Sequence, residues 1–190
     1  MKEQIKKLQK NALITGAMHG GIENKKSAAA VADVCGINYQ HTKYDEIHKL
    51  NPSMPIVATE VTSTFAVRGC YESKEETHEI ACYDDYPSDW GANVRDTWKA
   101  IMEREFVAGG FVWTGFDYMG EPTPYEWPSV SSFFGMMDLC GFPKDAFYLS
   151  RAIFSKEPVC HILPHWNHAG KEGELITVMS HTNWEEAQLY

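Results

Sequence analysis

The sequence lacks any long hydrophobic run. No stretch among its 190 residues approaches the eighteen or more apolar residues that a membrane-spanning helix requires, so we expect no membrane partner. The amino terminus also lacks the apolar run of a secretory signal, because Lys2, Lys6, Lys7 and Lys10 interrupt it. These first residues have the composition of a solvated helix instead.

The chain is also short of positive charge. It has 17 Lys and Arg residues against 26 Asp and Glu residues, which gives a formal net charge of -9. Proteins that bind nucleic acid present a cationic surface to the phosphates, and no stripe of Lys or Arg follows the first ten residues. We therefore exclude a nucleic-acid partner.

Signatures of a metal site or a disulfide framework are missing too. The five cysteines are odd in number and form no CxxC pair, so they predict neither a zinc ribbon nor a set of disulfides. His161, His165 and His168 lie close together in the sequence, but without the HExxH pattern of a zinc-binding helix. We expect no metal and no cofactor.

Apolar segments that alternate with helical ones are the main positive feature. The expected helices are residues 2–10, 24–32, 44–50 and 90–106, and the expected strands are residues 12–18, 33–39, 55–60 and 109–118. Strands that are apolar on both faces and alternate with helices are typical of a parallel sheet covered on both sides. A last helix is expected over 148–154, and a strand over 175–180 with no helix after it indicates the start of a separate β domain.

Polar and aromatic side chains stand where three of these strands end. Asn38 and Tyr39 close the second strand, Glu60 closes the third, and Trp113 and Asp117 lie toward the end of the fourth. In a barrel of alternating strands and helices the carboxyl ends of all strands meet at one rim, where active sites form. The pattern alone leaves open that Glu60 only caps the following loop and that the aromatic residues only pack in a core.

Several segments together resemble the β-galactosidases of glycoside hydrolase family 2. The similarity runs from about residue 11 to the end of the chain. The segments that carry it are residues 55–60 (PIVATE), 68–71 (RGCY), 109–122 (GGFVWTGFDYMGEP), 134–145 (FGMMDLCGFPKD) and 163–166 (LPHW). The resemblance implies an α/β fold. Residues 1–157 would form strands 5 to 8 of a (β/α)8 TIM barrel, and residues 158–190 would begin an immunoglobulin-like β-sandwich.

The resemblance also implies a retaining exo-β-glycosidase that hydrolyses a terminal β-linked sugar through a covalent glycosyl-enzyme. Glu60 looks like the catalytic nucleophile, and Tyr39 corresponds to the tyrosine that hydrogen-bonds it. Trp113 resembles the tryptophan on which the sugar ring stacks. Polar residues at the rim are candidates for binding sugar hydroxyls, although they can equally anchor loops; they are Asn38, Asp117 and Glu121.

The general acid/base of the family is not found. Relatives supply it from a Glu that follows an Asn at the end of the fourth strand, whereas here Glu23 and Asn24 stand in reverse order in a loop. We expect the chain to need the missing N-terminal half of the barrel, and residues 1–190 alone to be inactive and poorly soluble because four strands leave open sheet edges. Turnover of a nitrophenyl galactoside by purified residues 1–190 would contradict this. A signal peptide would belong to the missing half, so these residues do not indicate the compartment. We favour the periplasm or the cell exterior because relatives are often exported.

Three alternatives stay open. A β-glucuronidase or β-mannosidase would share these motifs, because sugar specificity depends partly on strands outside the sequence. A non-catalytic carbohydrate-binding module could present its aromatic residues as a stacking platform; these are Trp90, Trp113, Tyr125 and Trp127. Such modules are usually β-sandwiches, so they would contain little helix. The third alternative is a degenerate gene product with a structural role.

Overall fold

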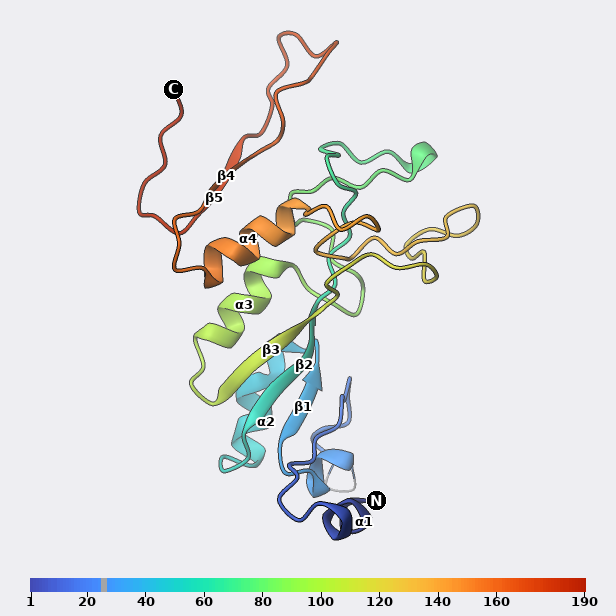
Figure 1. Ribbon diagram of the computed structural model, residues 1–190, viewed down its shortest axis with the longest axis vertical. Helices are drawn as coiled ribbons and strands as arrows, with labels where there is room; N and C mark the ends of the chain where they lie inside the picture. Colours follow the sequence, from blue (N-terminus) through green and yellow to red (C-terminus); the bar gives the residue numbers. More distant parts are fainter. Residues whose placement is uncertain (25–26) are drawn as a thin grey trace. The chain divides into compact units, whose positions relative to one another are not determined.

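The computed structural model describes residues 1–24 and 27–190 (Figure 1). The chain forms two compact units, and each is described by itself. The first unit comprises residues 1–63, 89–92 and 96–113, and the second comprises residues 64–88, 93–95 and 114–190.

A parallel sheet is the centre of the first unit. Its strands are β1 (Cys35–Asn38), β2 (Ile56–Thr62) and β3 (Val107–Trp113), in the order β1-β2-β3, and all are parallel. Helix α2 (Tyr44–Leu50) joins β1 to β2, and α3 (Val94–Met102) precedes β3. Ile37, Ile56, Ala58 and Val61 are completely or almost completely buried, whereas Phe111 of β3 is 67% exposed, so the two faces of the sheet are not equally covered. The chain is therefore an α/β protein, as predicted.

Two glycines allow close packing around this sheet. A β-carbon at Gly36 would lie 2.2 Å from the carbonyl oxygen of Gly16 and 2.9 Å from Cγ2 of Thr59. A β-carbon at Gly110 in β3 would lie 3.0 Å from Cδ1 of Ile101, which belongs to the buried face of α3. The sheet thus has glycine where a neighbouring segment or side chain comes closest.

The prediction of a buried strand over residues 12–18 is wrong. The segment makes one isolated parallel bridge, between Met18 and Ile37, and Leu13 within it is 77% exposed. It lies along the outer edge of β1, where Ile14 accepts backbone hydrogen bonds from Asp33 and Val34. Its apolar sequence predicted burial, but alternate residues of the segment are exposed, so one of its two faces is uncovered.

The second unit contains one complete α-helix, one antiparallel strand pair and long loops, as far as its described residues go. Helix α4 (Asp145–Phe154) is followed by β4 (Cys160–Leu163), which pairs with β5 (Met179–Thr182). The ring of Tyr148 on α4 stacks on His161 of β4 with the ring centroids 3.8 Å apart. A short 3-10 helix, η3 (Glu75–Thr77), lies in the loop over 64–88.

Several boundaries differ from the sequence expectations. The helix expected over 24–32 is only the 3-10 helix η1 (Ala28–Val31), and residues 25 and 26 lie outside the described residues. The other helices appear as α1 (Lys2–Leu8), α2, α3 and α4, with a short 3-10 turn η2 (His41–Lys43) before α2. The strand expected over 175–180 begins later, at Met179, because pairing with β4 sets its position, and β4 itself was not predicted.

Candidate active site

A β-bulge in β2 lies at the centre of the candidate site. Ile37 of β1 is paired with Ala58, but the next residue, Asn38, is paired with Glu60, so Thr59 is an extra residue in β2. The pairing with β3 has the same extra residue, since Ala58 is opposite Gly110 and Val61 is opposite Val112. A bulge places two residues opposite one and redirects their side chains. Thr59 and Glu60 therefore both oppose Asn38.

Glu60 and Tyr39 form a direct hydrogen bond. The Tyr39 hydroxyl donates to Oε2 of Glu60 at 2.9 Å, and the Tyr39 backbone N–H donates to the Glu60 carbonyl oxygen at 2.7 Å. Tyr39 is 7% exposed, while Glu60 is half-buried. Burial and the hydrogen bond to the Glu60 carboxylate both raise the pKa of Tyr39, so its hydroxyl stays protonated as a donor.

The backbone turns abruptly where β1 and β2 end. Four residues there that are not glycine have left-handed backbone angles, which are uncommon for such residues and often mark functional sites; they are Tyr39, Gln40, Thr62 and Ser63. Hydrogen bonds hold this conformation, since Ala92 N–H donates to the Thr62 carbonyl oxygen at 2.8 Å and the Gln40 side chain donates to the carbonyl of His19. The side chains at these strand ends are thus attached to a fixed backbone.

Trp113 ends the third strand of the same sheet. It is paired with Thr62, and the Thr62 hydroxyl lies 3.5 Å from the Trp113 carbonyl oxygen. Its side chain is half-buried. The structure therefore gathers Asn38, Tyr39 and Glu60 into one cluster and places Trp113 at the same carboxyl-terminal edge of the sheet.

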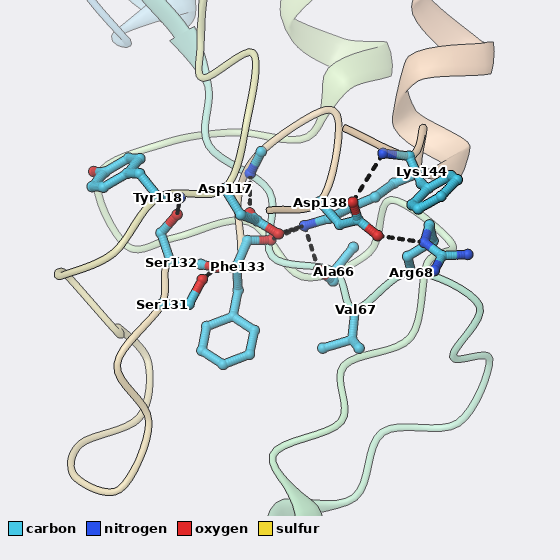
Figure 2. A network of polar contacts seen from close by, with 12 residues as sticks. Ala66, Val67, Arg68, Asp117, Tyr118, Ser131, Ser132, Phe133, Asp138 and Lys144 are labelled. Carbon is cyan, nitrogen blue, oxygen red and sulfur yellow. Dashed lines mark hydrogen bonds and ion pairs between the residues drawn. The ribbon is translucent and has the colours of Figure 1, made fainter. Parts of the chain in front are cut away.

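Asp117 lies in the second unit and is paired with a buried lysine (Figure 2). Lys144 is 1% exposed, and its ammonium group donates to Asp117 Oδ2 at 2.7 Å and to the carbonyl oxygens of Ala66 at 2.8 Å and Phe133 at 3.0 Å. The other carboxylate oxygen of Asp117 accepts the Gly135 N–H at 2.7 Å. Burial raises the pKa of Asp117 and lowers that of Lys144. Both oxygens of Asp117 are thus already bonded within the protein.

Glu121 also lies in the second unit. Its carboxylate accepts a hydrogen bond from the Tyr118 hydroxyl, and its backbone has a left-handed conformation. Unlike Asp117, Glu121 is exposed to solvent. The Glu121 side chain is thus more accessible to solvent than that of Asp117.

Two residues beside the Glu60 cluster were not singled out in the sequence. The Thr59 hydroxyl donates to Oδ1 of Asn38 at 2.6 Å, and the ring of His19 packs edge-on against Tyr39 with the centroids 5.8 Å apart. The sequence gives no signal for Thr59, because it lies within an apolar strand segment. Its position at a bulge is defined only by the pairing of β2 with β1 and β3. His19 was detectable, because it follows the segment over 12–18 in the way that Tyr39 follows β1.

The described residues contain no group of three or more His, Cys, Asp or Glu side chains that could hold a metal ion. Over the same part of the chain, no helix has the length and apolar character needed to cross a membrane.

Comparison with known proteins gives consistent results. No protein-family model matches the chain. The beta-galactosidase BoGH2A of Bacteroides ovatus is 36% identical over 155 residues, which cover 73% of this chain and 18% of the relative. Other curated relatives are named beta-glucuronidases. The chain thus spans about a fifth of the length of the curated relatives it matches.

Solved structures show the same similarity. A beta-glycosidase from Bacteroides vulgatus matches 95% of this chain and 27% of its own, with 27% identity and a TM-score of 0.78. A glycosyl hydrolase family 2 member from Bacteroides cellulosilyticus matches 94% of this chain and 22% of its own, with 25% identity and a TM-score of 0.65.

Proposed function

Because the chain belongs to glycoside hydrolase family 2, we propose that it supplies the nucleophile side of the active site of a retaining β-glycosidase. The observation that carries this proposal is the hydrogen bond from the Tyr39 hydroxyl to Glu60 Oε2 at 2.9 Å, two residues before the carboxyl end of the parallel strand β2. This arrangement presents an oriented carboxylate to solvent, next to a donor that stays protonated.

The chemistry follows from this geometry. Oε1 of Glu60, the oxygen that does not accept the Tyr39 bond, would attack the anomeric carbon and expel the aglycone oxygen. A second carboxyl group, about 5 Å away in retaining enzymes, would protonate that oxygen and then activate water. The hydrogen bond from the Tyr39 hydroxyl would hold the Glu60 carboxylate in a fixed orientation before attack. We propose that the second carboxyl group comes from a part of the enzyme outside residues 1–190.

The fold supports a barrel origin for these strands. We propose that residues 1–157 supply strands 5 to 8 of a (β/α)8 barrel, with the segment over 12–18 as strand 5 and β1, β2 and β3 as strands 6, 7 and 8. The parallel order β1-β2-β3 and the parallel bridge at Met18 support this assignment. The antiparallel pair β4–β5 supports a sandwich domain that begins within residues 158–190.

The other candidate residues take different roles in this proposal. Trp113 would stack on the sugar ring, and Asn38 would bind one of its oxygens. Glu121, which is exposed, remains a candidate for a sugar hydroxyl. For Asp117 we propose positioning of the loops around Lys144 instead of sugar contact, because both of its oxygens have protein partners.

The substrate that we propose is a terminal β-linked galactoside, by analogy with BoGH2A. A β-glucuronide is the second candidate, because curated relatives carry the beta-glucuronidase name. A non-catalytic carbohydrate-binding module is less well supported, since the first unit is a parallel sheet with helices and not a sandwich. Hydrolysis of nitrophenyl β-galactoside against nitrophenyl β-glucuronide would separate the two substrates.

Covalent trapping tests the proposal directly. We expect the complete enzyme, treated with 2,4-dinitrophenyl 2-deoxy-2-fluoro-β-galactoside, to lose activity and gain the mass of one fluorogalactosyl group. The fluorine slows both steps, and the good leaving group restores the first, so the glycosyl-enzyme accumulates. Peptide mapping should place the label on Glu60, and excess galactose should slow labelling. A label on any other residue would overturn the assignment. If the galactose reagent does not label the enzyme but the corresponding glucuronic acid reagent does, the second substrate is favoured.

A further inference from the structure

We propose that Thr59 is a positioning residue that fixes the Asn38 amide as a hydrogen-bond donor to an oxygen of the bound sugar. The inference rests on the proposed glycosidase function and adds a residue to it. Thr59 itself would not contact the substrate, because its hydroxyl points to Asn38.

The assignment follows from an account of the donors and acceptors of Asn38. An amide side chain offers one acceptor oxygen and two N–H donors. The Asn38 oxygen accepts the Thr59 hydroxyl at 2.6 Å, and its backbone N–H donates to the Met18 carbonyl oxygen at 2.8 Å. Within the described residues no hydrogen bond from the Asn38 side-chain nitrogen is found. Its two N–H groups are therefore available beside Glu60, with which Asn38 is paired across β1 and β2.

The Thr59 side chain is fixed in turn by its surroundings. Its γ-methyl group lies against Gly36, so close that a β-carbon at residue 36 would lie 2.9 Å from it. With the methyl group there and the hydroxyl on Asn38, both branches of the side chain have a defined place. The bulge brings Thr59 close enough to Asn38 for this hydrogen bond, because it places both Thr59 and Glu60 opposite Asn38.

This arrangement limits what the site can bind. If the side-chain amide of Asn38 could flip by 180°, its oxygen and nitrogen would exchange positions, and the same position could present either an acceptor or donors. With its oxygen held by Thr59, it offers donors alone, so the partner must be an oxygen that accepts, such as a sugar hydroxyl. A substrate that lacks this oxygen leaves the donors unpaired and is discriminated against.

The experiment compares Thr59→Val and Thr59→Ser in the complete enzyme. Valine keeps the shape but removes the hydroxyl, whereas serine keeps the hydroxyl and serves as the matched control. With nitrophenyl β-galactoside we expect Thr59→Val to lower kcat/KM about tenfold and Thr59→Ser to stay within about twofold. With a series of monodeoxy galactosides, the tenfold loss should disappear for the one analogue that lacks the oxygen bound by Asn38.

A purely structural role predicts something different. It would lower kcat/KM by the same factor for every monodeoxy analogue, and that result would overturn the inference, as would a Thr59→Val variant with unchanged kinetics. If Thr59→Val does not fold, Asn38→Asp replaces it, because aspartate still accepts the Thr59 hydroxyl but has no N–H to donate. Asn38→Asp should then show the same selective loss, and an equal loss on all analogues would again overturn the inference.

A parent enzyme with no β-glycosidase activity would overturn the proposed function itself and this inference with it, whereas parent activity without the Thr59 effect overturns only the inference.

Discussion

Glu60→Gln is expected to lower kcat of the complete enzyme on an aryl β-galactoside by about four to six orders of magnitude. The amide is nearly the same size as the carboxylate, so Tyr39 keeps a hydrogen-bond partner and the strand end keeps its shape. What disappears is the negative charge and the nucleophilic oxygen. Because the interaction lost is made mainly in the transition state, KM should change far less than kcat.

The matched control is Glu105→Gln, an exposed glutamate in the same unit that should leave kcat unchanged. Glu60→Ala gives an independent check. With a dinitrophenyl galactoside, added azide should restore turnover by attacking the anomeric carbon from the side that Glu60 vacates, and the product should be the α-galactosyl azide. A Glu60→Gln variant that keeps near-normal kcat would remove Glu60 from the mechanism.

Lys144→Met is expected to have the largest effect on stability. It leaves the buried Asp117 carboxylate without its cationic partner and removes the lysine donor from the Ala66 and Phe133 carbonyl oxygens, of which the Phe133 oxygen keeps the Ala66 N–H at 2.9 Å. Breaking a buried pair in this way costs about 3–5 kcal/mol. Since other parts of a large enzyme unfold separately, the measurement is hydrogen exchange in the peptide over 131–145, where protection should fall by a comparable free energy.

The pH dependence of this defect has a definite sign. Burial raises the pKa of Asp117 above its usual 3.8 even with Lys144 in place, and removal of the ammonium group raises it further. A carboxyl whose folded-state pKa is raised favours folding when it is protonated, so the defect of Lys144→Met should shrink as the pH falls toward 4 and grow above it. Asp117→Asn combined with Lys144→Met should recover part of the protection, and exposed Lys99→Met should change nothing. Equal defects in the single and double variants would show that the pair is not the cause.

The sequence predicted the sheet better than its edges. β1 and β2 were found because their residues are apolar on both faces, and α2 was found because Asn51 and Pro52 follow it. The segment over 12–18 has the same apolar composition, but composition does not reveal how many neighbours a strand has. β4 was missed because it is only four residues long and depends on pairing with β5, about twenty residues further along.

The site shows the same limit. Glu60 lies in the family-like segment over 55–60 and Tyr39 follows the apolar residues of β1, so both could be selected from the sequence; in the structure their side chains are hydrogen-bonded. Asp117 was selected for the same reason, but its partner Lys144 is 27 residues away and nothing local indicates the pair. Thr59 was out of reach, since an extra residue in β2 is defined only against the strands beside it.

The extra residue in β2 matters for anyone who wishes to transplant this chemistry into a designed protein. Side chains on regular strands alternate between the two faces, so a tyrosine and a glutamate copied onto ideal parallel strands would keep the identities but lose the mutual orientation. A graft that keeps the geometry has to copy the one-residue bulge at Thr59 along with the functional groups. It also has to keep glycine at position 36 of the adjacent strand, where a β-carbon would lie 2.9 Å from the Thr59 methyl group.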